Sequence, residues 1–160
     1  MVDAFLKIDG IEGESQDSKH GKEIEILSYS YGATQPGTAS AGGGMGAGKV
    51  AMADIHFTHT IDKASPKLML ACCTGDHIKS AIFTVRKAGG TQLEYVVMTL
   101  SDVLVSSVQI SGHGDNNTRP MEQFSLNFSK IQYDYKEQKA DGSLGGAVAM
   151  GYDIKQNKKV

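Results

Sequence analysis

The fold class is decided by residues 78–100, which read IKSAIFTVRKAGGTQLEYVVMTL. In the first half of this stretch apolar and polar side chains alternate at period two, as they do in a half-buried strand. One face of that half carries Ala81, Phe83 and Val85, and the other carries Thr84 and Arg86. Ala88-Gly89-Gly90 then supplies turn residues, and Thr91–Leu100 continues as a second strand. The stretch therefore predicts a β-hairpin.

Segments with the same alternation lie on both sides of this hairpin. In chain order they are 24–31, 49–61, 103–111, 121–135 and 148–155. In the first and the fourth of these segments the apolar residues change from even to odd positions part-way along. Each change predicts either a β-bulge or a strand whose two halves bury opposite faces.

One segment departs from the strand pattern. Ser65 has the chemistry of a helix N-cap, Pro66 suits the first helical position, and Gly75 stands where a helix usually ends. We therefore predict one helix over Pro66–Thr74. Many short strands with one helix predict an all-β barrel or sandwich that carries a helix on one side.

Some predicted strands hold more apolar residues than one buried face can use. Within Leu93–Leu100 the apolar side chains occupy both faces of the strand. A small closed barrel buries only its inward face, so apolar outward positions need cover. The excess fits a subunit interface, and it also fits an asymmetric sandwich core, and the pattern alone leaves both open.

Length and composition exclude several classes of protein. The 160 residues suit a single domain over residues 1–160, and 40% hydrophobic with 21% charged residues is a globular composition. The formal net charge is −2, whereas proteins that bind nucleic acid or anionic membranes usually carry an excess of positive charge. No run approaches the roughly 18 apolar residues of a membrane-spanning helix. We therefore expect neither nucleic-acid binding nor membrane insertion.

The beginning of the sequence and its cysteines indicate the compartment of synthesis. No basic region followed by an apolar run opens the chain, so we expect no cleaved secretory signal and synthesis in the cytoplasm. Cys72 and Cys73 are adjacent and are too few for a disulfide framework. We expect both to be free thiols.

The clearest match to a catalytic motif is Gly43–Lys49, which satisfies the G-x-x-x-x-G-K part of a phosphate-binding loop. Val50 stands where that motif needs Ser or Thr for magnesium, and the next segment alternates like a strand instead of opening a helix. We interpret this stretch as an inter-strand loop. The reading as an enzyme would require nucleotide binding here.

The histidines do not form a metal motif. His56 and His59 are three residues apart on a predicted strand and so lie on opposite faces, and the other three lie in or beside turns. The chain also lacks a G-x-S-x-G nucleophile elbow. We predict no enzyme, no metal and no cofactor.

The segment 28–31, Ser-Tyr-Ser-Tyr, separates two kinds of side chain. Tyr29 and Tyr31 point to one face of the predicted strand, while Ser28 and Ser30 point to the other. This favours a sheet with one packed side and one wet side, although an ordinary amphipathic strand has the same pattern.

Several segments, in order along nearly the whole chain, together resemble one known family. The matching segments are Phe5–Ile8 with Gly13–Ser15, Ile61–Pro66 with Leu68-Met69 and Ala71-Cys72, Val85–Gly90 with Glu94-Tyr95, Val103–Val108, and Gln138–Gly142 with Gly151-Tyr152. The set is similar to the haemolysin co-regulated protein (Hcp) family, the tube component of bacterial type VI secretion systems.

This resemblance implies a closed or near-closed β-barrel of two packed antiparallel sheets, with one helix on its side. It implies hexameric rings that stack into a tube, which a contractile sheath expels together with spike-tip components. Small effector proteins would travel in the channel of the ring, and export by the machine itself would need no signal sequence. The apolar outward positions would then form the contact between neighbouring barrels.

Two groups of residues follow as candidate sites. We expect Ser28 and Ser30 to line the channel and contact cargo. The small, turn-type residues of two loops are expected at the ring-stacking surfaces: Gly42, Gly43, Gly44, Met45, Gly46, Ala88, Gly89 and Gly90. The competing reading is a stand-alone ligand-binding barrel or exported binding protein, which requires an interior too large for its inward side chains.

Overall fold

The computed structural model describes residues 2–37, 48–114 and 118–160. Its strands are β1 (Val2–Ile8), β2 (Ile24–Glu25), β3 (Ser28–Ser30), β4 (Ala33–Thr34), β5 (Ala51–Met52), β6 (Ile55–Thr60), β7 (Ile78–Lys87), β8 (Glu94–Ser111), β9 (Met121–Gln138), β10 (Leu144–Asp153) and β11 (Lys158–Lys159). The helix α1 spans Ser65–Thr74. The described helix is too short to cross a lipid bilayer.

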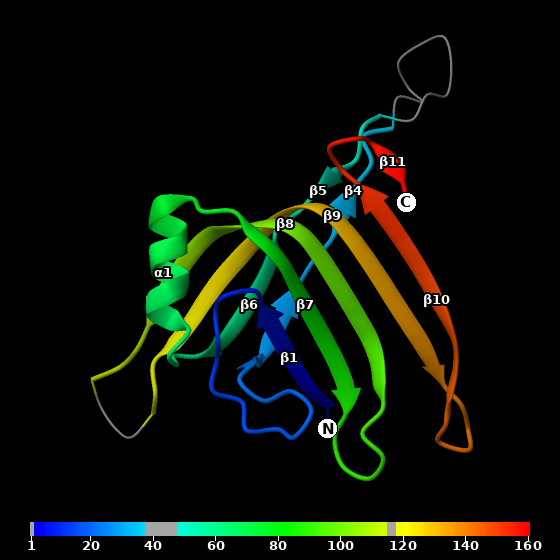
Figure 1. Cartoon of the computed structure of the whole chain (residues 1–160), viewed down its shortest axis with the longest axis horizontal. Coiled ribbons are helices and arrows are strands. Elements are labelled where there is room, and N and C mark those ends of the chain that lie inside the picture. Colours follow the sequence, from blue (N-terminus) through cyan, green and yellow to red (C-terminus); the bar gives the residue numbers. More distant parts are fainter. Residues whose placement is uncertain (1, 38–47, 115–117) are drawn as a thin grey trace.

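A nine-stranded antiparallel sheet folds over on itself into a near-closed barrel (Figure 1). Its order is β11-β10-β9-β8-β7-β1-β2, and β6 joins it by pairing with both β9 and β3. Residues 24–30 complete the circuit: the Ile26 N–H donates to the Ala4 carbonyl of β1, and the Leu27 N–H to the Thr58 carbonyl of β6, both at 2.9 Å. The predicted barrel is confirmed, with its two packed layers belonging to one continuous sheet. A two-stranded ribbon, β4–β5, stands apart.

The predicted hairpin is confirmed as β7–β8, and β8 runs on without a break through the segment expected as a separate strand. β8 and β9 are each 18 residues long. Both switch their buried face at one place, between Leu100 and Val103 in β8 and between Phe128 and Ile131 in β9. The pairing of the two strands keeps its register across the switch. Of the two alternatives predicted for 121–135, the strand with oppositely buried halves is therefore correct.

The switch in β8 centres on Asp102, whose φ of 55° lies in the left-handed region. Aspartate tolerates this region better than most residues. Its carboxylate contacts His77 Nδ1 at 2.9 Å and accepts a hydrogen bond from Lys155 Nζ at 2.6 Å. The hydrogen bond from Lys155 lowers the pKa of Asp102 to about 2. The bend thus joins the start of β7, the middle of β8 and the turn after β10.

In segment 24–31 the apolar residues change from even to odd positions for a different reason. The segment is divided into β2, which pairs with β1, and β3, which pairs with β6. Ile24 and Ile26 are buried where the chain runs beside β1. Tyr29 instead packs its ring against Phe83, with 4.7 Å between the ring centroids. The residues pass from one wall of the barrel to the other.

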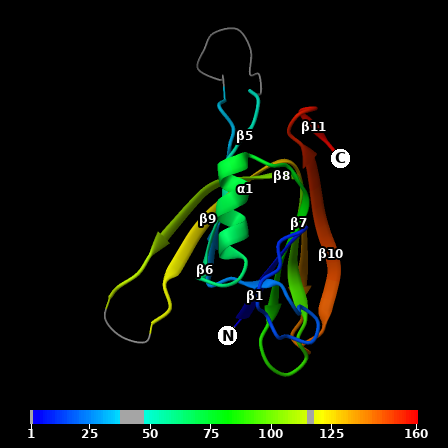
Figure 2. The same cartoon turned by 60° about the vertical axis from the view of Figure 1, so that its left-hand side comes forward.

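Inward side chains fill the barrel. Phe57, Phe83 and Phe124 are at most 1% exposed, with ring centroids 5.2 and 5.5 Å from Phe57. The helix α1 lies on the side of the barrel (Figures 1 and 2), and its Leu68 is fully buried. The chamber that a stand-alone ligand-binding barrel requires is therefore occupied by the protein's own side chains.

The helix starts one residue before its predicted start, and Ser65 is not its N-cap. Ala64 is the N-cap, and no side chain caps it. Ser65 Oγ instead accepts a hydrogen bond from the Asp62 N–H at 3.1 Å, which stabilises the turn before the helix. The predicted end is confirmed, because Gly75 has a φ of 68° and donates its N–H to the Ala71 carbonyl at 2.9 Å.

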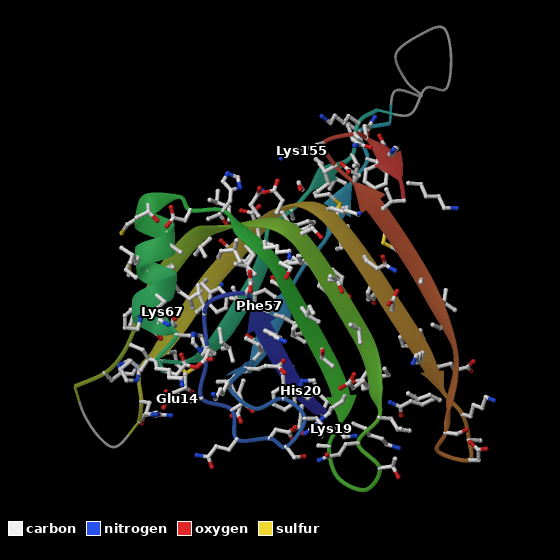
Figure 3. All side chains as sticks on the ribbon, in the orientation of Figure 1. Glu14, Lys19, His20, Phe57, Lys67 and Lys155 are labelled. Carbon is white, nitrogen blue, oxygen red and sulfur yellow. The ribbon has the colours of Figure 1, made fainter. Side chains whose placement is uncertain are left out.

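Arg86, expected on a polar face, is only 1% exposed because residues 9–23 pack over it. Its guanidinium forms a bidentate pair with Asp17, with one N–H···O distance of 3.0 Å, and lies 4.8 Å from the centre of the Phe5 ring. His20, labelled in Figure 3, stacks on Phe5 at 4.6 Å and contacts two carboxylates, Glu23 at 2.8 Å and Glu94 at 2.7 Å. This cluster fastens residues 9–23 to β1, β7 and β8.

We predict that Asp17→Asn lowers the melting temperature by several degrees at pH 7, because it leaves a buried guanidinium without its main counter-ion. The hydrogen bond from Arg86 holds the pKa of Asp17 well below its usual value of 3.8. Ionised Asp17 therefore stabilises the fold above that value, and the contribution is lost as the pH falls below it. Thermal melts at equal protein concentration should show a wild-type advantage that is full at pH 7 and shrinks below about pH 4.

The control is Asp9→Asn, which changes an exposed carboxylate with no side-chain contact among the described residues. A difference between wild type and Asp17→Asn that grows on acidification would contradict this account.

A close backbone approach at Gly13 gives a second prediction. A Cβ atom there would lie 2.5 Å from the Glu23 carbonyl oxygen, so Gly13→Ala must displace the main chain. We expect a loss of about 1–3 kcal/mol in the free energy of unfolding, measured by urea titration. The control Gly37→Ala adds its Cβ where no atom of the described residues lies within 4 Å, and it should change stability little. Equal stability of the two variants would show that the approach is not tight.

Candidate assembly surface and channel wall

The second half of β9, together with β10 and β11, extends past the barrel (Figure 1). One face of this extension is apolar in register across the strands, with Tyr135 opposite Val148, Tyr133 opposite Met150, and Ile131 opposite Tyr152. We call these six residues the apolar overhang. Val148 is 73% exposed, and Tyr135 and Met150 are each more than 40% exposed. Ile131, by contrast, is only 5% exposed, so the uncovered part of the overhang is at Tyr135, Val148 and Met150.

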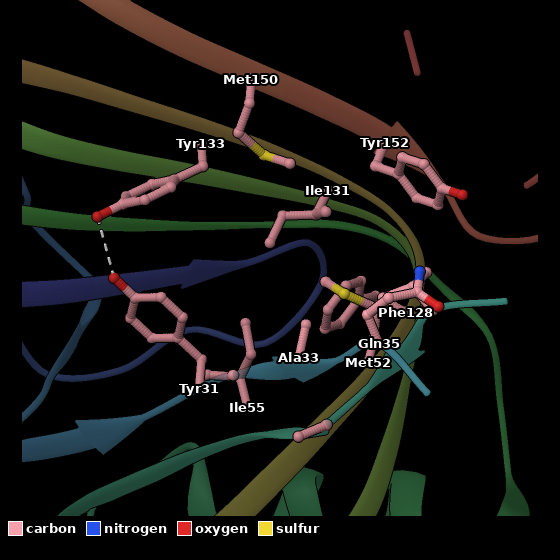
Figure 4. A pocket seen from close by; sticks show the side chains of 13 residues that line it. Tyr31, Ala33, Gln35, Met52, Ile55, Phe128, Ile131, Tyr133, Met150 and Tyr152 are labelled. Atoms are coloured by element: carbon pink, nitrogen blue, oxygen red, sulfur yellow. Dashed lines mark hydrogen bonds between the residues drawn. The ribbon is translucent and has the colours of Figure 1, made fainter. Parts of the chain in front are cut away.

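The tyrosines of the Ser-Tyr-Ser-Tyr segment face the overhang. The Tyr31 hydroxyl donates a hydrogen bond to the Tyr133 hydroxyl at 3.1 Å, and the two rings meet edge to face at 5.9 Å (Figure 4). Burial, reinforced by the Tyr133 hydroxyl, raises the pKa of Tyr31, so its phenol stays neutral. Tyr29 and Tyr31 nevertheless remain 42% exposed each. A slot lined by aromatic and aliphatic groups thus lies between β3 and the overhang.

The slot continues into a cleft of about 440 Å³ beside the β4–β5 ribbon (Figure 4). Its lining comprises Tyr31, Gly32, Ala33, Gln35, Val50, Met52, Ala53, Ile55, Phe128, Ile131, Tyr133, Met150 and Tyr152. No lining residue carries a charge. The cleft lies on the flank of the molecule, outside the filled interior.

The opposite side of β3 belongs to a polar surface. Ser28 and Ser30 point away from the core, as expected, because Tyr29 between them contacts Phe83. Register places Thr58 and His56 of β6 beside them, and the outward residues of β9 and β8 extend the surface. We call this surface the polar wall; it comprises Ser28, Ser30, His56, Thr58, Ser107, Gln109, Gln123, Ser125 and Asn127. Ser125 points to the same side but is only 2% exposed, and its hydroxyl is hydrogen-bonded to those of Ser106 and Ser107. None of these nine residues is Asp, Glu, Lys or Arg, although Asp54 lies at the margin of the wall and accepts a hydrogen bond from Asn127 Nδ2 at 2.8 Å.

The polar wall has an unpaired strand edge on each side. β3 pairs with β6 alone, and residues 104–111 of β8 pair with β9 alone, as far as residues 2–37, 48–114 and 118–160 are concerned. The β8–β9 hairpin leaves the barrel on the flank away from β10 (Figure 2). Its inward face carries Val108 and Ile110, and Ile110 is 45% exposed. Exposed strand edges are templates for pairing with another chain.

The remaining candidate residues lie elsewhere. Ala88, Gly89 and Gly90 form the exposed β7–β8 turn, with Gly89 and Gly90 at positive φ. Gly42, Gly43, Gly44, Met45 and Gly46 lie outside the described residues. Val50 is followed by strand β5, consistent with an inter-strand loop.

The histidines and cysteines are placed largely as expected. His56 is exposed on the polar wall and His59 is 1% exposed, which confirms their opposite faces. His59 Nε2 lies 2.7 Å from Glu122 Oε1 in the core. Cys72 and Cys73 are free thiols on α1. No group of three or more His, Cys, Asp or Glu suited to a metal occurs in the described ranges.

Sequence reasoning missed most of these two surfaces. The alternation of 121–135 did signal the outward Gln123 and Asn127, but only the register shows that they adjoin Ser28 and Ser30. The apolar excess in Leu93–Leu100 fitted either an interface or a sandwich core, and none of its large apolar residues is among the exposed ones. Those lie on other parts of the chain, including Leu27, Leu70 of α1, Tyr135 of β9, and Val148 and Met150 of β10.

Comparisons with known proteins agree with this architecture. Residues 5–135 match the family model described as "Type VI secretion system effector, Hcp". The chain is 49% identical over 158 residues to the protein hcp1 of Pseudomonas aeruginosa, covering 98% of this chain and 97% of that protein. The crystal structure of Hcp1 from Salmonella typhimurium is 39% identical with a TM-score of 0.81, covering 99% of both chains.

A further solved structure, titled a type six secretion system protein, is 30% identical with a TM-score of 0.94 and covers all of both chains. The sequence match spans more than half of the chain, and the structural matches include the barrel, the overhang strands and the helix in one superposition. The chain therefore belongs to the Hcp family of type VI secretion system proteins.

Proposed function

We propose that the chain is the structural subunit of the inner tube of a type VI secretion system. Copies form a closed ring, rings stack into a tube, and effector proteins occupy the channel. The observation that carries this proposal is the pair of complementary surfaces on opposite flanks, namely the β8–β9 hairpin on one side and the slot between β3 and the overhang on the other.

The two flanks fit each other chemically. With two copies side by side, the β8 edge of one copy lies along the β3 edge of the next, and the polar wall continues from copy to copy. The inward residues Val108 and Ile110 of the hairpin then enter the slot and cover Val148 and Met150. The apolar surface that one copy leaves exposed is buried by the next copy.

This contact joins different patches on the two copies, so it is heterologous and closes when the rotation per copy completes a circle. Each large apolar side chain that becomes fully buried contributes about 1.5–3 kcal/mol, and every contact in the ring repeats that gain. Closure also removes the two free strand edges. The number of six copies rests on membership in the family.

The polar wall would line the channel, with Ser28 and Ser30 among its cargo contacts. A lining made mostly of uncharged side chains holds cargo mainly by short-range hydrogen bonds rather than by long-range attraction, which suits cargo that must be released. We also propose that the Ala88–Gly90 turn contributes to ring stacking, because it lies at the end of the molecule opposite the β4–β5 ribbon (Figure 1). Sheath and spike-tip components would be the partners in export.

We predict that Val148→Asp prevents ring formation, because it places a carboxylate in the apolar contact without a counter-ion. Light scattering should show single 17.1 kDa chains, and negative-stain microscopy no annular particles. Ala147→Asp is the matched control, since it adds the same charge on the opposite face, across from Lys136, and should keep the rings. Normal rings in Val148→Asp, or a wild type that stays single at every concentration, would overturn the proposal.

Ser30→Gln or Ser30→Arg should reduce the amount of small effector protein that copurifies with rings, because the longer side chain intrudes into the channel. Rings should remain intact, since Ser30 points away from the slot. The control Ser18→Gln changes an exposed serine outside the wall. Unchanged retention in intact Ser30→Gln rings would defeat the assignment of this face to the channel.

A further inference from the structure

The polar wall has an internal order that its composition does not reveal. Register aligns Ser28, Thr58, Gln123 and Gln109 in one row across β3, β6, β9 and β8. The next row contains Ser30, His56, Ser125 and Ser107. Directly opposite residues on neighbouring strands have Cβ atoms about 5 Å apart, so each row is a continuous line of side chains perpendicular to the strands.

Resting on the proposed channel, we propose that Gln109 and Gln123 form a cargo-binding site that selects uncharged, hydrogen-bonding polypeptide groups. These groups are exposed backbone amides and the side chains of Asn, Gln, Ser and Thr. We call the row that contains the two glutamines the glutamine row. In a closed ring this row repeats in every copy and encircles the channel.

The two glutamines have the reach to make first contact. Both side chains are exposed and are longer than the serine and threonine side chains in the same row. Neither amide is hydrogen-bonded to another side chain or main-chain group among the described residues. Each amide offers two N–H donors and one oxygen acceptor. They are therefore available to pair with a donor or an acceptor on a cargo surface.

A hollow of about 180 Å³ adjoins these amides and is large enough for a side chain. It is lined by Thr58, Gln109, Ser111, Met121, Glu122 and Gln123. Glu122 is fully buried and its carboxylate contacts His59, so it presents no exposed charge to the hollow. The Thr58 and Ser111 hydroxyls add further donors and acceptors.

The class of ligand follows from the glutamine row, which contains no Asp, Glu, Lys or Arg. The Asp54 carboxylate at the margin of the wall is hydrogen-bonded to Asn127, outside this row. A charged cargo group pressed against this surface would lose hydration without gaining a counter-ion. An amide or hydroxyl group exchanges its water for a Gln109 or Gln123 hydrogen bond at little net cost. The glutamine row therefore favours neutral polar surfaces over strongly charged ones.

The experiment uses purified rings and a fluorescent peptide of alternating Asn, Ser and Gly. Two companion peptides carry Lys or Asp in place of Asn. Binding is measured by fluorescence anisotropy for wild type, for the double variant Gln109→Leu/Gln123→Leu, and for Gln123→Glu. Gln132→Leu is the control, since it changes an exposed glutamine in the same strand outside the wall.

We expect wild-type rings to prefer the neutral peptide, and the double leucine variant to bind it about tenfold more weakly. Gln123→Glu should shift the preference toward the Lys peptide, and Gln132→Leu should behave like wild type. Intact rings with unchanged binding in the double variant, or wild-type rings that bind no peptide or all three equally, would overturn this inference. Light scattering on each sample separates these outcomes from a failure to form rings, which would count against the proposed function instead.

Discussion

The bend that β8 and β9 share at Asp102 is the constraint on which the rest of the structure depends. Two long strands stay paired while exchanging their buried faces, so one half of the pair builds the polar wall and the other half extends into the apolar overhang. Contacts from His77 and Lys155 hold the Asp102 carboxylate at this point. If the two strands did not exchange their buried faces, the apolar side chains of the overhang would not face β3. The slot between β3 and the overhang would then not form.

The bend also explains why the molecule leaves apolar surface uncovered. A barrel hides its apolar residues by closing, and residues 24–30 close this one. Strands β10 and β11 lie outside that circuit, and Val148 and Met150 on the apolar face of β10 remain exposed. A second copy supplies that partner in the proposed ring, and the same contact joins one polar wall to the next. Assembly and channel lining are then two consequences of one arrangement.

The local features were predictable from the sequence because they depend on short-range rules. Alternation gave the β7–β8 hairpin, Gly75 gave the end of the helix, and the Ser-Tyr-Ser-Tyr segment gave the orientation of its tyrosines. Ser65 misled as an N-cap because a serine can equally accept a hydrogen bond from the preceding turn. Arg86 misled because nothing in its own strand indicates that residues 9–23 cover it. The polar wall and the slot join residues about a hundred positions apart, and only strand register brings Ser28 beside Thr58 and Gln123.

The most direct test of the ring places one cysteine on each free edge, Ser30→Cys in β3 and Ser107→Cys in β8, with Cys72 and Cys73 replaced by serine. Within one chain two strands separate these positions, about 14 Å at the usual strand spacing, so they cannot form a disulfide with each other. The account predicts that oxidation links neighbouring copies into a ladder of covalent multimers that ends in a closed hexamer. The account would be contradicted if oxidation left only single chains, both with this pair and with the alternative pair Ser30→Cys and Gln109→Cys.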